Sequence, residues 1–100
     1  MNKDISEAVV QLFSACLEVT AHGEHHAFCD YQAHVGWLEV MVYPACANYQ
    51  ADFSEQRLLN SRIAIDGWGV ETPEEIARAL SQIKETTGRL YGLAEIKEAA

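Results

Sequence analysis

The chain has 100 residues, a length typical of one domain with its own core, and 49% of them are hydrophobic while 22% are charged. This composition is that of a globular protein and excludes an intrinsically disordered chain. The formal net charge is −8, and neither Lys nor Arg occurs between Asp4 and Gln56. A nucleic-acid binder needs cations to replace the counterions of the phosphates, so direct binding of DNA or RNA is disfavoured, as is adhesion to an anionic membrane.

The apolar runs are all far shorter than the roughly 20 residues that cross a bilayer. The first residues have no signal-peptide pattern. Three cysteines, Cys16, Cys29 and Cys46, have no CxxC spacing and indicate reduced thiols. We therefore expect a single cytoplasmic domain over residues 1–100.

The first predicted element is a helix from about Asp4 to Val19, which Gly23 terminates. Asp4 and Glu7 have the offset of a capping box. Seven apolar residues recur at the spacing that predicts one buried face. They are Ile5, Ala8, Val9, Leu12, Phe13, Cys16 and Leu17.

Three strands are expected next. The first two, about 26–31 and 36–43, are separated by so few residues that they predict an antiparallel hairpin. The second alternates strictly between two sets of side chains, which is the period of a strand, and Pro44 ends it. A longer connection over residues 45–57 can include helical character at 52–57. The third strand covers about 58–66, with Leu59, Ser61, Ile63 and Ile65 on one side.

The second helix begins at the strongest local signal of the sequence, Thr72-Pro73-Glu74-Glu75. This run supplies an N-cap Thr, a Pro at the first helical position and the Glu of a capping box. Glu74 and Glu75 form an acidic cluster with Asp66 and Glu71. Carboxylates are expected in a first helical turn because they complement the helix dipole, so we assign the cluster a capping role, with recognition of a basic partner as the alternative. The helix is predicted to reach about Thr87, where Gly88 ends or weakens it before a last helical segment.

These elements predict an α+β fold of order α-β-β-β-α, in which both helices pack on one face of a three-stranded antiparallel sheet. The predicted core face of the sheet carries five apolar side chains, each contributing roughly 1.5–3 kcal/mol on burial. They are Leu38, Val40, Val42, Ile63 and Ile65.

The opposite face of the sheet is the leading candidate for a binding surface. Trp37, Met41 and Tyr43 are expected to point away from the helices, joined by Phe28 of the neighbouring strand. Such an apolar face is typical of an interface with a protein partner or a second copy. The alternative is that the 45–57 connection or the C-terminal segment covers it.

A second candidate is the histidine-rich stretch from His22 to His34, whose imidazoles and the Cys29 thiol are ligand types that suit zinc. In a strand, however, His26 and Cys29 face opposite sides, and no second ligand pair follows. Metal or small-ligand binding in this region stays an alternative. Neither Cys29 nor Cys46 has the frame of a catalytic nucleophile, and no P-loop or GxGxxG occurs, so we predict no enzyme activity and no cofactor.

In element order the chain is similar to the double-stranded-RNA-binding domain. In that family the first helix, the first strand connection and the lysine-rich start of the second helix bind RNA. The corresponding parts here are an acidic helix, Gln32-Ala33-His34 and Thr72-Pro73-Glu74-Glu75, so RNA binding is rejected.

The run from Tyr31 to Tyr43 also resembles the hairpin of small uncharacterised phage and prophage proteins, in which a turn precedes a His-Val-x-Trp-Leu-x-Val-x-Val-Tyr strand. Ala33 stands where that pattern has a turn glycine. The resemblance covers about fifteen residues and implies an accessory protein with no catalytic residues.

The predicted function is therefore a small non-enzymatic interaction module. It would act as a homodimer or bind a host or viral protein, with the acidic first half selecting basic partners. A more specific version is an inhibitor that occupies a nucleic-acid-binding surface by presenting phosphate-like charge. The alternatives are the metal- or small-ligand-binding protein and an uncharacterised enzyme.

Overall fold

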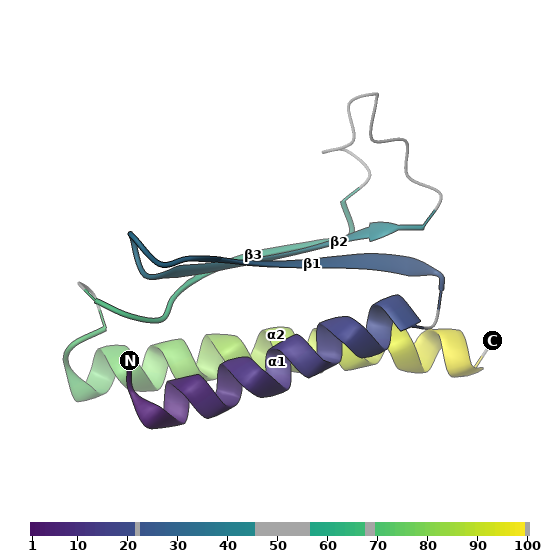
Figure 1. Cartoon of the computed structure of the whole chain (residues 1–100). Coiled ribbons are helices and arrows are strands. Elements are labelled where there is room, and N and C mark those ends of the chain that lie inside the picture. The colour runs from purple at the N-terminus through teal and green to yellow at the C-terminus, as the bar shows by residue number, and fades with distance from the viewer. Residues whose placement is uncertain (22, 46–56, 68–69, 100) are drawn as a thin grey trace.

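The structure, a computed structural model, describes residues 1–21, 23–45, 57–67 and 70–99, with side chains described up to residue 93. The elements are α1 (Lys3–Ala21), β1 (His25–Gln32), β2 (Trp37–Pro44), β3 (Leu59–Ala64) and α2 (Pro73–Ala99). The strands form one antiparallel sheet in the order β1-β2-β3. Both helices lie on the same side of this sheet, α1 beneath β1, as Figure 1 shows. The predicted α-β-β-β-α fold is confirmed.

The core lies between the sheet and the helix pair. All five residues predicted for the inner face of the sheet are almost fully buried, as is Leu59. The helices contribute a second set of buried side chains, which are Ile5, Ala8, Leu12, Ala15, Cys16, Val19, Ala79, Ile83 and Leu90. Within the part of the chain that the structure describes, neither helix is long and apolar enough to cross a membrane.

The two helices begin with different caps. At α2 the predicted capping box is present, since Glu75 N donates to Thr72 Oγ1 at 3.1 Å and Thr72 N donates to Glu75 Oε1 at 3.0 Å. At α1 the predicted box of Asp4 and Glu7 is wrong. Asn2 Oδ1 instead accepts hydrogen bonds from the backbone N–H groups of Asp4 and Ile5. Asn is as good an N-cap as Asp, so the sequence offered two equivalent starts.

Gly88 does not end α2, which continues through it to Ala99. A glycine inside a helix costs roughly 1 kcal/mol relative to Ala. Burial of Leu90 two residues later exceeds this cost, because a fully buried Leu contributes about 1.5–3 kcal/mol. Tertiary packing therefore decides the length of α2.

The predicted buried face of α1 is too wide. Phe13 and Leu17 were expected in the core, but 49% and 61% of their surfaces are exposed. The sheet and α2 together cover only the side of α1 that carries Ile5, Leu12 and Val19. The predicted helical character at 52–57 lies almost wholly outside the described residues.

The turn between β1 and β2 is tied to the end of β3. Gly36 adopts φ +69°, and its carbonyl accepts hydrogen bonds from Ile65 N at 2.9 Å and Asp66 N at 3.2 Å. A Cβ atom at this position would collide with the Asp66 carbonyl. The close approach fixes the turn between β1 and β2 against the end of β3, and Trp37 directly follows this turn.

Candidate interaction surface

The face of the sheet opposite the helices is called the outer face below. The pairings of Phe28 with Met41, Asp30 with Glu39 and Glu39 with Arg62 set the register of its side chains. By the alternation of strand side chains, it consists of His26, Phe28, Asp30, Gln32, Trp37, Glu39, Met41, Tyr43, Asn60, Arg62 and Ala64. All four residues predicted to bind a partner therefore lie on this one face.

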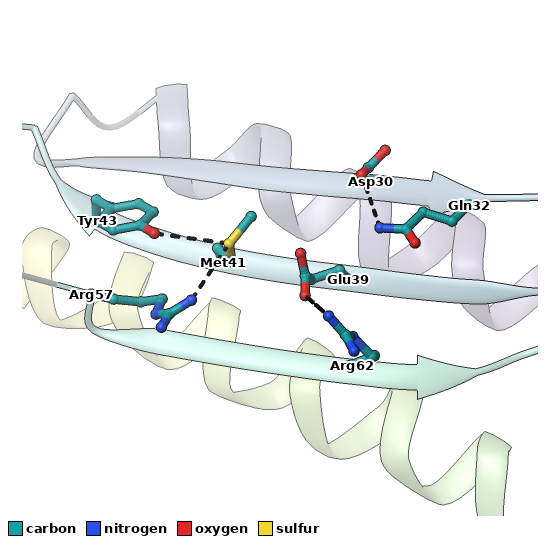
Figure 2. A network of polar contacts seen from close by, with 7 residues as sticks. All are labelled: Asp30, Gln32, Glu39, Met41, Tyr43, Arg57 and Arg62. Carbon is teal, nitrogen blue, oxygen red and sulfur yellow. Dashed lines mark hydrogen bonds and ion pairs between the residues drawn. The ribbon is translucent and has the colours of Figure 1, made fainter. Parts of the chain in front are cut away.

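The four predicted residues differ in exposure. Phe28 and Trp37 expose 43% and 37% of their surfaces, whereas Met41 is half-buried. Tyr43 is only 2% exposed, which corrects the expectation that its phenol is freely accessible. Its ring meets that of Phe28 edge to face at 5.8 Å, and its hydroxyl donates to Met41 Sδ at 3.8 Å (Figure 2). Tyr43 thus supports Phe28 from below the surface.

Charged side chains lie between the two exposed rings. Asp30 and Glu39 are direct cross-strand neighbours, an arrangement of like charges that is unfavourable by itself. Arg62 of β3 donates from Nη2 to Glu39 Oε2 at 3.0 Å and places its guanidinium 4.9 Å from the centre of the Trp37 ring. Figure 2 shows this row of side chains crossing all three strands.

Asp30 lies at the end of this row. Gln32 Nε2 donates to its carboxylate at 3.4 Å, which is long for a hydrogen bond, and the amide donor carries no charge. Arg62 neutralises Glu39 on the other side, so the Asp30 carboxylate is the part of the row that a cation from outside would complement best. The sequence did not reveal this row, because Arg62 and Asp30 are 32 positions apart.

Below the sheet, Cys16 of α1 and Cys29 of β1 bring their thiols together. The hydrogen bond with Cys29 is the main cause that raises the pKa of Cys16, and burial of the thiol raises it further. The same bond lowers the pKa of Cys29, against the opposing effects of burial and of the Asp30 charge. Both are free thiols. Cys29 therefore belongs to the helix side of the sheet, and Cys46 lies outside the described residues.

The histidine-rich stretch is split between surfaces. His26 lies on the outer face and Cys29 on the inner one, as predicted, while His34 is exposed in the hairpin turn. Among the described residues no three His, Cys, Asp or Glu side chains form a group that could hold a metal ion. His22 lies outside those residues. A hollow of about 390 Å³ at the turn is lined in part by His34, Trp37 and Asp66.

The capping role predicted for the acidic cluster is confirmed for Glu75, while the Asp66 carboxylate lies 3.8 Å from the N-terminal amino group of Met1. Hydrogen bonds to Glu75 from the backbone N–H groups of Thr72 and Glu71 lower the pKa of its carboxyl. The carboxylate is thereby used to satisfy the start of the helix.

Comparisons with protein-family models, with curated proteins and with solved structures found no match. The likeness to phage and prophage hairpins stays a prediction. The functional argument rests on the surface of this chain.

Proposed function

We propose that the protein is a non-enzymatic interaction module that binds another protein through its outer face. The observation that carries the proposal is the exposure of Phe28 and Trp37 on the side of the sheet that neither helix covers. Aromatic residues are enriched at interfaces because a rigid ring buries a large apolar area at a small cost in conformational entropy.

The charges of the outer face favour a basic partner. A Lys or Arg that reaches Asp30 relieves the repulsion between this carboxylate and Glu39, while apolar groups of the same partner cover Phe28 and Trp37. The net charge of −8 adds a long-range attraction for cations. The partner we propose therefore presents an apolar side chain next to at least one cation.

Salt distinguishes this mode of binding from mimicry of a nucleic acid. An inhibitor that presents phosphate-like charge would lose affinity steeply with ionic strength, because exposed charges are screened beyond about 10 Å at 0.1 M salt. Binding through the two rings is expected to fall by less than about tenfold over the same range. The small-ligand alternative would use the hollow beside His34, which adjoins Trp37.

The test is affinity capture from the cells in which the protein occurs, with wild type, Trp37→Ala and Tyr91→Ala as baits. Tyr91 is an exposed aromatic residue of α2, away from the outer face, and serves as the matched control. A partner of the outer face is retained by wild type and Tyr91→Ala and lost by Trp37→Ala. For an anchor residue the affinity should fall by about 30-fold or more, measured by calorimetry with the purified partner.

Circular dichroism confirms that each bait is folded. Equal capture of the same proteins by wild type and Trp37→Ala, with equal affinities, would contradict the proposal.

A further inference from the structure

The side of α1 that faces away from the core carries a continuous line of side chains with three exposed apolar residues at its centre. Val10, Phe13 and Leu17 are 63%, 49% and 61% exposed, and their spacing of three and four residues places them on one side of the helix. Lys3 and Ser6 extend the line in one direction and Thr20 in the other. These six residues are called the α1 stripe. Exposed apolar residues that are contiguous in this way mark an interaction site.

The stripe has the period of a helix–helix seam. Its residues 3, 6, 10, 13, 17 and 20 repeat at alternating steps of three and four, which is the spacing of the a and d positions that meet in paired helices. A partner helix that lies nearly parallel or antiparallel to α1 can therefore bury the whole stripe.

The position of the stripe leaves it accessible. Thr20, at its end, accepts a hydrogen bond from Ala27 N at 3.1 Å with its Oγ1. The end of the stripe at Thr20 therefore lies next to β1, and Figure 1 shows that α1 itself runs beneath this strand. The outer face lies on the other side of the sheet.

Charge is excluded from the middle of the stripe. Asp4, Glu7 and Glu18 are the acidic residues of α1, and at 100° per residue all three lie outside the stripe. A second molecule can thus approach Phe13 without bringing these carboxylates into the centre of the contact, although each chain carries a net charge of −8.

We propose that the stripe is a dimer interface, in which α1 packs antiparallel against α1 of a second copy around a two-fold axis near Phe13. In this arrangement Val10 of each copy meets Leu17 of the other, and the surface is complementary to itself. Lys3, which is the single Lys or Arg among the first 56 residues, then lies at the C-terminal end of the other copy's α1. Cations are favoured there by the helix dipole, and α1 has no basic residue of its own in its last turn.

The first measurement is the solution mass of the purified wild-type chain over a concentration series. A mass approaching twice 11.1 kDa supports the proposal, and a monomer at the highest concentration overturns it. Leu17→Glu is expected to weaken self-association by about 100-fold or more, because it places an unpaired charge in the seam. Val35→Glu, at an exposed apolar residue of the hairpin turn, is the matched control and should leave the mass unchanged.

A mixing experiment tests the antiparallel register. Val10→Glu and Leu17→Lys are each expected to be monomeric when purified separately. Mixed, they should form a heterodimer, because the introduced Glu of one copy meets the introduced Lys of the other while an unaltered Val–Leu pair forms at the far end. Failure of the mixture to associate, or a dimer that survives Leu17→Glu, overturns the proposal. Trp37→Ala should not change the mass, so this result and that of partner capture are independent.

Discussion

Replacing Gly36 by Ala is expected to destabilise the fold strongly, for two separate reasons. The left-handed backbone at φ +69° costs a residue with a Cβ about 1–2 kcal/mol. The added Cβ also collides with the Asp66 carbonyl, which must move away. That movement weakens the hydrogen bonds from Ile65 N and Asp66 N to Gly36, each of which contributes about 1 kcal/mol. The total is about 3–4 kcal/mol.

Two other glycines separate these contributions. Gly67 also has a positive φ, +77°, but an added methyl group there would meet no neighbouring atom, so Gly67→Ala should cost only the roughly 1–2 kcal/mol of the backbone conformation. Gly88 lies in α2 with open space around it, so Gly88→Ala should stabilise by about 0.5–1 kcal/mol.

The assay is urea unfolding followed by circular dichroism, with an unchanged slope as the check on two-state behaviour. In thermal unfolding, Gly36→Ala should lower Tm by roughly 12–30 °C, at about 4–8 °C per kcal/mol. If Gly36→Ala and Gly67→Ala cost the same within about 0.5 kcal/mol, the close approach of the hairpin turn to Asp66 does not occur.

Two further predictions concern ionisable groups. The pKa of Glu75 is lowered from its ordinary value of 4.5, so the ionised carboxylate stabilises the fold at a pH above 4.5. This contribution disappears as the pH falls through the lower pKa of the folded state. Glu75→Gln should therefore reduce Tm at neutral pH and make little difference in strong acid; a constant difference would contradict the capping role. Because the pKa of Cys29 lies below its ordinary 9.0 and that of Cys16 above it, iodoacetamide at neutral pH should alkylate Cys29 first, as read by peptide mass spectrometry. Faster labelling of Cys16 would reverse the assignment.

The sequence predicted those parts of the fold that depend on local periodicity. The alternation of β2 fixed which of its side chains face the helices, and the Thr72 box located the start of α2. The sequence left open whether Gly88 ends or only weakens the helix, because the continuation of α2 through it depends on the burial of Leu90, which is a tertiary effect.

Local periodicity also predicted part of the candidate surface, and tertiary packing decided the rest. Alternation alone placed Trp37 on the outer face, but the burial of Tyr43 depends on surroundings that the sequence does not specify. Only Phe13 and Leu17 of the α1 stripe belong to the seven apolar residues that predicted the buried face of this helix, so that set did not reveal the stripe. That set spans more of the helix circumference than one packed layer covers, which was the available signal that some of its members face solvent.

The position of Arg62 against the Trp37 ring gives the outer face an optical reporter. The emission of an indole depends on nearby charge and on its contact with water, and this guanidinium is held at the ring by Glu39. A molecule that settles on the ring displaces either water or the guanidinium, so in a Trp68→Phe background the fluorescence of Trp37 should register occupancy directly. The same residue that anchors a ligand can therefore be used to screen for one, without any label attached to the chain.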